Sequence, residues 1–380
     1  MKIALNLLPL RTGGGVQVAL DFLAQLQASD NQHEWYVIAR DIPIFADLEA
    51  GSTIKLVRRV RDSYFSRFRF EHIDAERLLR DHDINLIYTQ FGPGWPVKGY
   101  FQIAGCAYSN LFYPELDFWG ALPFHARLRK KAIDAFRLGA IKKAQVSIFE
   151  TEDLAIRARN MLGLDEERIK FVKASVSSLV NQNSRHPETE KRFHRVPEGN
   201  NVLLLSGYHV NKNIEFLLRV AKEIKLRGIF GVRFVLTLPP ELSQTKNLMD
   251  EVRKSGCEDL VYNIGPIPQE GCCEAYRKCK FTILPSMLES FSNTIAETWE
   301  MGNPLLVSDL SWARSLCGQA AAYYKYLNVD SFIETLLGLI NDDTAREDLI
   351  IEGRKQLSTY PTSRQRFESY MSIIEQVVEK

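Results

Sequence analysis

Two glutamates, Glu289 and Glu297, form an E-x7-E arrangement within the sequence PSMLESFSNTIAE at residues 285–297. The apolar residues just before this segment, at 279–284, predict a buried strand, so the segment begins where that strand ends. In open parallel sheets, ligands bind at the carboxyl ends of the strands. Carboxylates in this position can accept hydrogen bonds from the hydroxyl groups of a bound sugar or ribose.

A helix is predicted to begin between these two glutamates, near Asn293. The first N–H groups of a helix have no partner within it, so those of Ser292, Asn293 and Thr294 would attract an anion, typically by ~0.3–1 kcal/mol each. An anion site flanked by hydroxyl acceptors suits a phosphorylated sugar. A purely structural alternative also fits, because Thr294 and Glu297 have the spacing of a capping box. Glu289 has no comparable structural role.

Three consecutive glycines, Gly13, Gly14 and Gly15, follow the first predicted strand and precede a helix. Glycines in such a turn let the backbone approach a ligand closely and expose its N–H groups. The dinucleotide fingerprint G-x-G-x-x-G is only half met, since Val18 replaces its third glycine, although Asp41 follows the second predicted strand, where a ribose-binding acid is expected. A nicotinamide-dependent oxidoreductase and a tight turn without function are therefore alternatives.

Lys212 lies in the sequence LLLSGYHVNKN, at a predicted turn from strand to helix in the second half of the chain. A lysine at such a turn can pair with a phosphate as a point charge, and His209 in the same turn would add a hydrogen-bond donor. The alternative for both residues is a solvated loop. Because Lys212 and Glu289 each follow a predicted strand, we expect them at the same edge of one sheet.

Residues 124–143 predict a cationic helix in which Asp134 is the one acid among many lysines and arginines. Phe124, Leu128, Ala132 and Phe136 recur at four-residue spacing and form an apolar stripe. We favour packing of this stripe against the sheet, with the basic face in solvent. The alternative is docking on an anionic membrane surface, which the aromatic-rich stretch at 64–70 would support.

With 380 residues, 45% hydrophobic and 25% charged, the chain has the composition of a globular protein of two domains. Its formal net charge of +1 gives no sign of nucleic-acid binding. The six cysteines include no CxxC pair, which argues against a zinc site and fits a reduced cytosolic setting. We expect the apolar start to be a strand and not a signal peptide, and no run of ~18 apolar residues predicts a membrane span.

Predicted buried strands alternate with amphipathic helices through most of the chain, which is the pattern of parallel sheets covered on both faces. A polar stretch at 181–201 has two prolines and no apolar period, and it predicts a linker or a surface excursion between two domains. A last helix is predicted at 363–379. The predicted strands are 2–8, 35–39, 84–89, 101–105, 146–150 and 169–173 before the linker, and 202–205, 232–237, 260–263, 280–284 and 304–307 after it.

Together these features resemble the retaining glycosyltransferases of family 4, which are group 1 glycosyltransferases with the GT-B fold, and among them members of surface-polysaccharide assembly. The resemblance is strongest at 203–323, where GYHVNKN, GPIPQE, LPSMLESFSNTIAE and GNPLLVSD follow the family's order. It implies an α/β protein with two Rossmann-like parallel-sheet domains facing a central cleft. The implied parts are an acceptor-side domain at 1–176, a nucleotide-sugar-binding domain at 177–359, and a C-terminal helix at 360–380 that returns to the first domain.

The resemblance also implies roles for single residues. Glu289 and Lys212 would be catalytic: the first binds hydroxyls of the donor sugar, and the second stabilises the leaving diphosphate. Glu297 would hold the ribose of the nucleotide. The donor site would further contain Ser292, Asn293 and Thr294 at the distal phosphate, then His209, Ser290 and Phe291, and the three glycines Gly13, Gly14 and Gly15 approaching from the other domain.

Two positions depart from the family pattern. An arginine usually follows the glycine of the second domain's first strand, where Tyr208 and His209 stand here, so one phosphate contact is missing or replaced. Many members also have a histidine at the end of a first-domain strand, which the stretch QIAGCAYSN lacks. Ser109 or Asn110 would take its place on the acceptor side.

We therefore expect a retaining, metal-independent hexosyltransferase that moves a sugar from a nucleotide diphosphate-sugar to a hydroxyl of a glycan or lipid-linked glycan. No separate cofactor is expected, because the nucleotide sugar is a substrate. The expected location is cytoplasmic, at the inner face of the membrane if residues 124–143 dock there. The alternatives are a non-catalytic nucleotide-sugar-binding partner subunit, a NAD-dependent Rossmann oxidoreductase and a nucleotide-sugar epimerase.

Overall fold

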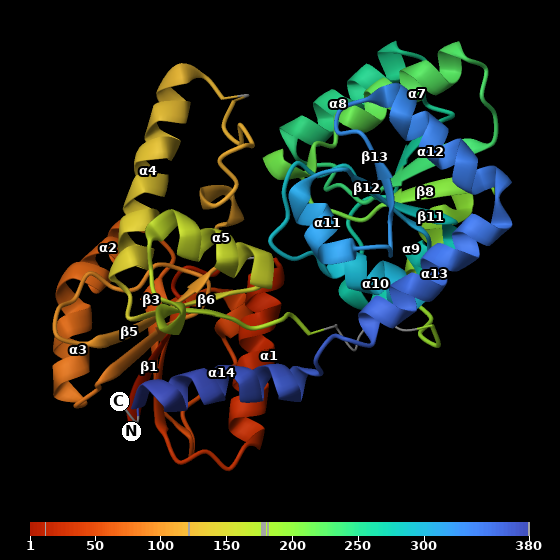
Figure 1. The fold of residues 1–380 in the computed structure, drawn as a ribbon. Coiled ribbons are helices and arrows are strands. Elements are labelled where there is room, and N and C mark those ends of the chain that lie inside the picture. The colour runs from red at the N-terminus through yellow and green to blue at the C-terminus, as the bar shows by residue number, and fades with distance from the viewer. Residues whose placement is uncertain (12, 121, 176–179, 181, 379–380) are drawn as a thin grey trace. The chain divides into compact units, whose positions relative to one another are not determined.

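The computed structural model describes residues 1–11, 13–120, 122–175, 180 and 182–378. The chain forms two compact units: the first is Met1–Ser175 with Pro361–Lys380, and the second is Val176–Tyr360 (Figure 1). Each unit contains one parallel sheet with helices packed on it. This confirms the prediction of two Rossmann-like domains of the α/β class.

The sheet of the first unit has the strand order β3-β2-β1-β4-β5-β6-β7, and its described pairings are parallel. The order reverses between β1 and β4, and such reversal points are where open α/β sheets bind ligands. Strand β3 was not predicted, because its sequence IKLVRRVR mixes apolar and basic residues at the edge of the sheet. The strands are β1 (Lys2–Asn6), β2 (Glu34–Asp41), β3 (Ile54–Arg61), β4 (Leu86–Thr89), β5 (Phe101–Cys106), β6 (Val146–Phe149) and β7 (Ile169–Phe171).

An aromatic cluster fastens the C-terminal helix to the first unit, as predicted. Phe22 lies edge-on to Trp35 and to Tyr88, with ring centroids 5.7 Å apart in both pairs. The rings of Phe367 and Tyr370 from α14 lie 5.2 and 5.9 Å from Phe22 and complete this core. The helices of the unit are α1 (Gly14–Ala28), α2 (Tyr64–Arg69), α3 (Ala75–Asp81), α4 (Phe124–Lys143), α5 (Glu152–Leu162) and α14 (Ser363–Val378), with a π-helical turn at Phe70–Asp74.

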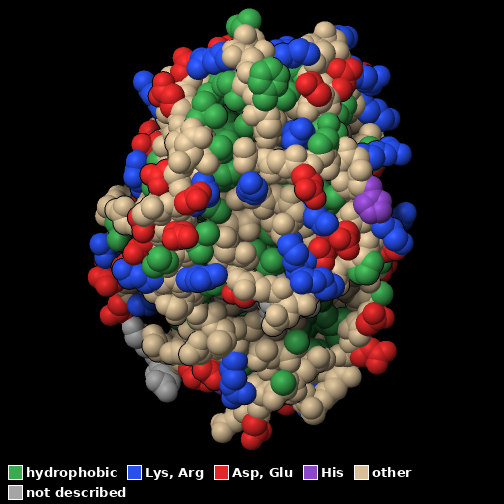
Figure 2. Space-filling view, turned by 90° about the vertical axis from the view of Figure 1, so that its right-hand side faces the viewer, with side chains coloured by type: hydrophobic (Ala, Val, Ile, Leu, Met, Phe, Trp, Pro, Cys, Tyr) green, Lys and Arg blue, Asp and Glu red, His purple; other side chains and the backbone are tan. Residues whose placement is uncertain are grey.

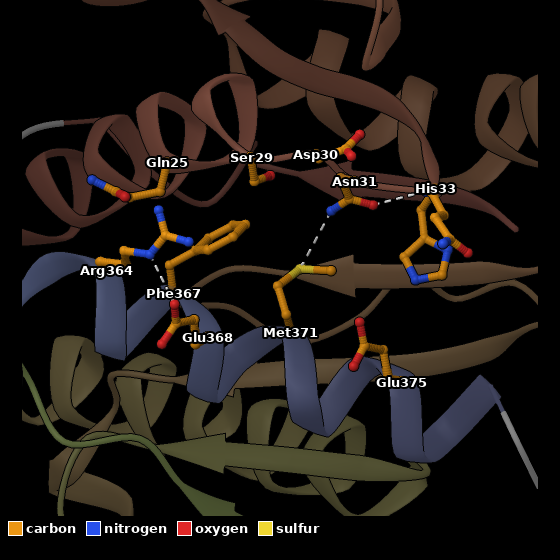
Figure 3. Close-up of a pocket in the computed structure, with 11 residues that line it drawn as sticks. Gln25, Ser29, Asp30, Asn31, His33, Arg364, Phe367, Glu368, Met371 and Glu375 are labelled. Atoms are coloured by element: carbon orange, nitrogen blue, oxygen red, sulfur yellow. Dashed lines mark hydrogen bonds and ion pairs between the residues drawn. The ribbon is translucent and has the colours of Figure 1, made fainter.

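A hollow of about 560 Å³ lies between the end of α1, residues 29–33 and α14 (Figure 3). Met371 points toward Asn31, whose side-chain nitrogen lies 3.9 Å from the sulfur. Because residues 29–33 lead into β2, this hollow lies at the amino ends of the strands. It is therefore separate from the edge where a substrate is expected.

The second unit has the strand order β10-β9-β8-β11-β12-β13, again parallel, and its order reverses between β8 and β11. Strands and helices alternate along the chain, so each helix leads back to the start of the next strand. The strands are β8 (Asn200–Leu204), β9 (Val232–Leu236), β10 (Val261–Asn263), β11 (Phe281–Leu284), β12 (Leu305–Ser308) and β13 (Ala322–Tyr324). The helices are α6 (Pro187–Arg192), α7 (Phe216–Leu226), α8 (Ser243–Lys254), α9 (Cys272–Lys278), α10 (Asn293–Met301), α11 (Ser311–Cys317), α12 (Val329–Asn341) and α13 (Asp343–Leu357).

The prediction of a linker at 181–201 is wrong for the described part of that stretch. Its polar residues form α6, which packs on α9 and belongs to the second unit. The His186 ring accepts a hydrogen bond from the Thr189 N–H at the start of α6, and Thr189 and Phe193 are buried. Arg192 donates a hydrogen bond to the carbonyl of Pro266, so this segment supports the loop after β10.

The apolar stripe of α4 does not pack on the sheet, and that interpretation is wrong. Phe124, Leu128 and Phe136 are 81%, 60% and 64% exposed, whereas Ile141 near the end of the helix is buried. Figure 1 shows α4 projecting from the first unit. The helix therefore presents both its basic and its apolar side chains to the surroundings.

Candidate functional site

An ion pair joins Lys212 and Glu289 at the carboxyl edge of the second sheet. Lys212 follows β8 and Glu289 follows β11, so both lie at the reversal point of the strand order. The Lys212 Nζ donates to Glu289 Oε1 at 2.7 Å, and the Ser286 hydroxyl donates to the same oxygen at 2.6 Å. Glu289 is only 6% exposed. A buried carboxylate needs such partners to stay charged, and Ser286 is one that the sequence analysis missed.

Backbone contacts join the two loops that carry this pair. The Asn211 side-chain amide donates to the Leu288 carbonyl at 2.8 Å, and the backbone carbonyl of Asn211 accepts a hydrogen bond from the Met287 N–H at 2.7 Å. The Asn213 amide donates to the Pro285 carbonyl at 3.2 Å. Asn213 has φ +48°, a left-handed conformation that asparagine tolerates better than most residues. The pair is therefore held in place before any ligand binds.

Helix α10 begins beside this pair and has no side-chain cap. Ser292 is its N-cap residue but makes no capping hydrogen bond through its side chain. The Thr294 hydroxyl donates to the Leu205 carbonyl at 3.2 Å, which ties the helix start to the end of β8. The capping box of Thr294 and Glu297 is therefore not formed, and that structural alternative is wrong. The first turn of α10 can offer its N–H groups to an anion.

Glu297 is buried inside the first turns of α10. Its Oε2 accepts a hydrogen bond from the Tyr276 hydroxyl at 3.0 Å. Burial raises the pKa of the Glu297 carboxyl above its ordinary value, and the hydrogen bond from Tyr276 works in the opposite direction. The E-x7-E spacing identified Glu297, but Tyr276 lies on α9 and nothing in the sequence pointed to it.

The segment between Glu289 and α10 is fixed by aromatic side chains. Ser290 and Phe291 are half-buried, and the Phe291 ring packs against Tyr360 with centroids 6.0 Å apart. The Trp312 indole N–H donates to the Met287 carbonyl at 3.0 Å. The predicted donor-site residues after β11 are therefore brought together with Lys212 in one compact region.

Tyr208 and His209, which stand where an arginine was expected, both have local partners. The Tyr208 hydroxyl donates to the Glu215 carboxylate, and burial together with this carboxylate raises the pKa of Tyr208. His209 is exposed, and its Nδ1 contacts the side-chain oxygen of Asn211. Among the described residues of this turn, Lys212 is the cation that pairs with Glu289.

The glycine turn of the first unit lies at the corresponding reversal point, between β1 and β4. Gly13 is the N-cap residue of α1, with φ +81°, and no side chain caps that helix. A Cβ on Gly15 would lie 3.1 Å from a Leu10 methyl carbon and 3.4 Å from the Phe91 ring. Gly13 is therefore required by its backbone conformation and Gly15 by close packing, while Gly13 and Gly14 are exposed.

The predicted acceptor-side residues Ser109 and Asn110 lie in a short turn at Ser109–Leu111 after β5. Ser109 is half-buried. The Asn110 amide donates to an oxygen of Asp134 at 3.0 Å, and Trp119 and Arg137 donate to the same carboxylate at 2.6 and 3.1 Å. Asp134 thus joins this turn to α4, which the sequence analysis did not foresee.

Three general properties of the surface and the site follow from the described residues. No group of three or more His, Cys, Asp and Glu side chains that could hold a metal ion occurs among them. None of their helices is both long and apolar enough to cross a membrane. On the face seen in Figure 2, basic and acidic side chains are interspersed.

One family model matches a large part of the second unit. Residues 199–342 match the family model described as "Glycosyl transferases group 1". The matched range contains Lys212, Glu289 and the start of α10. No match was found among curated protein sequences.

Solved structures of glycosyltransferases share the fold along the whole chain. Sucrose-phosphate synthase from Thermosynechococcus elongatus is 13% identical, with a TM-score of 0.76 over 100% of this chain and 99% of its own. HepE from Anabaena, in complex with UDP and glucose, is 15% identical, with a TM-score of 0.70 over 99% and 100%. WaaG, a glycosyltransferase involved in lipopolysaccharide biosynthesis, is 12% identical, with a TM-score of 0.71 over 98% and 99%. The predicted resemblance to group 1 glycosyltransferases with the GT-B fold is confirmed.

Proposed function

We propose that this protein is a retaining glycosyltransferase that moves a sugar from a nucleotide diphosphate-sugar to a hydroxyl of a glycan or lipid-linked glycan. One observation carries the proposal: an ion pair between the half-buried Lys212 and the buried Glu289 lies beside the uncapped start of α10, at the strand reversal of the second unit. Positive charge and free N–H groups there suit a diphosphate, and the carboxylate suits a sugar hydroxyl.

The ion pair would change partners as the reaction proceeds. An ammonium has three N–H donors, so Lys212 can keep Glu289 and also bind a phosphate oxygen. The bond from the anomeric carbon to the diphosphate breaks, and a bond from the acceptor oxygen forms on the same face. The proton of the acceptor hydroxyl passes to the departing diphosphate oxygen. Lys212 and the first turn of α10 stabilise the charge that builds up on the leaving group, so the step would need no metal ion.

The nucleoside would bind on the other side of the diphosphate. The Glu297 carboxylate accepts one hydrogen bond from Tyr276, and its remaining lone pairs can accept from the ribose hydroxyls. The base would be recognised by the backbone of the loop at 265–268, which Arg192 supports through the Pro266 carbonyl. Since HepE was solved with UDP-glucose, uridine nucleotides are the first to test.

A thermal-shift panel of nucleoside diphosphates and nucleotide sugars tests this function. A ligand that binds only the folded chain raises the free energy of unfolding, by about 2.7 kcal/mol at a ligand concentration of one hundred times the Kd. The melting temperature therefore rises. We expect the nucleoside diphosphate of one base to raise the melting temperature clearly. This rise should persist when a chelator is added, because the proposed site binds the diphosphate without a metal ion. The matching nucleotide sugar should then support transfer with retained anomeric configuration, measured by NMR. No shift with any nucleotide, or inverted product, would contradict the proposal.

The exposed surface of α4, together with α2, is proposed to dock on an anionic lipid bilayer. On α2, Tyr64 and Phe65 are 82% and 76% exposed, and Phe124 at the start of α4 is 81% exposed. Arg137, in the second half of α4, stacks on the Tyr108 ring at 4.0 Å, and the charge of Arg67 on α2 acts on the same ring. Apolar side chains among lysines and arginines match an anionic membrane, and this would bring the enzyme to a lipid-linked acceptor on the cytoplasmic face.

Co-sedimentation with phosphatidylglycerol vesicles tests the membrane surface. The double substitution Phe124→Ser with Leu128→Ser should lower the bound fraction about tenfold or more, because it removes apolar burial in the bilayer. Phe230→Ser is the matched control, since Phe230 is 90% exposed but lies in the second unit. Binding should also weaken with added salt. The membrane role would be refuted if the double variant bound vesicles as well as Phe230→Ser does. It would also be refuted if the wild-type chain did not bind vesicles.

A further inference from the structure

A buried amide without partners stands at the strand reversal of the first unit. Gln90 directly follows β4 and is 1% exposed, and neither its Oε1 nor its Nε2 has a hydrogen-bond partner. Its backbone N–H is satisfied by the Asn6 carbonyl at 3.1 Å, so only the side chain lacks partners. Leaving a buried polar group unpaired destabilises a protein by about 1–3 kcal/mol. A bound ligand would supply the hydrogen-bond partners that this side chain lacks in the free protein.

The position of Gln90 after β4 indicates which face of the sheet its side chain occupies. Side chains alternate along a strand, so Gln90 lies on the same face of the sheet as Tyr88, which packs against Phe22 of α1. Gly15, in the first turn of α1, packs against Phe91, the residue after Gln90. The chain at Gln90 and Phe91 therefore passes close to the first turn of α1, which contains the glycine turn. Two independent features meet there: an uncapped helix start and a polar side chain with free donors and acceptors.

Two more buried polar atoms without partners belong to the core of the first unit. The Tyr88 hydroxyl is buried and unpaired, and so is the Nε of Arg366 on α14. Arg366 is 4% exposed, and its Nη2 donates to the Tyr370 hydroxyl at 3.4 Å. Among these groups, Gln90 is the one that adjoins the exposed glycine turn, whereas Tyr88 lies two residues deeper in the strand.

We propose that the Gln90 amide recognises a hydroxyl of the acceptor sugar, in a subsite roofed by Gly13 and Gly14. An amide donates through nitrogen and accepts through oxygen, and a sugar hydroxyl needs both. The charged groups of the donor find partners in the second unit, whereas this edge offers a neutral group that matches a glycan. The ligand reaches the amide by displacing the glycine turn, whose backbone has a wide choice of conformations. This inference rests on the proposed glycosyl transfer.

The substitution Gln90→Met separates a ligand-binding role from a structural one. It keeps the size of the side chain and removes both polar atoms. Because these atoms have no partners in the free chain, the melting temperature without ligand should stay the same or rise. The KM for the acceptor should rise about tenfold, while the donor KM and the shift caused by the nucleoside diphosphate stay unchanged. Tyr88→Phe, which also removes an unpaired atom on this face, is the control and should leave every KM unchanged.

Each other outcome overturns the inference in a recognisable way. Loss of folding in Gln90→Met, or a lower melting temperature with unchanged KM values, would show that the amide makes structural hydrogen bonds. A rise in the donor KM alone would assign the amide to the donor. If the wild-type chain neither responds to any nucleotide nor transfers sugar, the proposed function itself fails. If the wild-type chain is active and Gln90→Met matches it, only the Gln90 subsite fails.

Discussion

Both units have polar side chains at equivalent points of their sheets, but these side chains differ in whether they have hydrogen-bond partners. In the second unit, Lys212, Glu289 and Ser286 form a closed set of hydrogen bonds, and Glu297 is paired with Tyr276. In the first unit, the side chain of Gln90 is buried with no partner. Both arrangements lie where the strand order reverses, between β8 and β11 and between β1 and β4.

The difference follows from the cost of burying charge. An isolated buried carboxylate or ammonium is far more costly than an unpaired amide, so a site for a diphosphate must pair its charges in the free protein. A neutral amide can stay buried and unpaired in the free protein, which destabilises the fold by about 1–3 kcal/mol. The proposed nucleotide site is therefore preorganised, and preorganised charge is what a leaving diphosphate requires. In our proposal, the Gln90 amide gains its hydrogen bonds only when the acceptor binds.

Lys212→Ala should produce the largest effect. Loss of the ammonium removes the charge opposite the leaving diphosphate, and we expect transfer to fall about 10²–10³-fold. The same change leaves Glu289 buried without its ion partner, which lowers the free energy of unfolding. Lys246→Ala, on the exposed side of α8, is the matched control. Turnover measured with the best nucleotide sugar checks the effect. Near-normal turnover in Lys212→Ala would contradict the role of Lys212 at the leaving diphosphate.

Glu297→Gln should change how stability depends on pH. The folded pKa of Glu297 is raised above its ordinary value of 4.5 by burial, so the folded chain holds this proton more tightly than the unfolded chain. Its contribution to stability is complete below pH 4.5 and is lost as pH rises through the folded pKa. The stability of Glu297→Gln relative to wild type should therefore increase as the pH rises from 4.5 through the folded pKa. The same substitution should weaken nucleotide binding. Parallel stability curves from denaturant titrations would contradict this assignment.

Ser286→Ala should give the smallest effect of the three. It removes one hydrogen bond to Glu289 but leaves the contact with Lys212. A hydrogen bond to a charged group contributes about 1.5–3 kcal/mol, so we expect a measurable drop in unfolding free energy and a modest loss of transfer. Ser243→Ala at the exposed start of α8 is a suitable control. An effect as large as that of Lys212→Ala would mean that Ser286 contacts the substrate directly.

The sequence predicted the parts of the site whose residues are close together along the chain. The E-x7-E segment, the helix start at Asn293 and the lysine after β8 all carry local signals of turn and periodicity. Ser286, Tyr276 and Gln90 were missed, because their importance depends on which residues face them across loops or helices. The pairing of Glu297 with Tyr276, for example, joins α10 to α9.

The errors in the fold have a similar cause. Helix α6 was predicted as linker because its sequence PETEKR is polar and only a few nearby side chains, such as Thr189 and Phe193, are buried. Periodicity correctly identified the apolar stripe of α4 but could not show what covers it, and Phe124 proved to be 81% exposed. A pattern of apolar residues therefore predicts a face, whereas the partner of that face is a property of the tertiary structure.

A crystal structure of the full chain with a bound nucleotide sugar would show which groups hold the diphosphate. We expect diphosphate oxygens at about 2.7–3.2 Å from the Lys212 ammonium and from N–H groups in the first turn of α10, with Glu289 on the sugar side and Glu297 on the ribose side. A nucleotide bound elsewhere, with Lys212 and Glu289 paired only to each other, would contradict it.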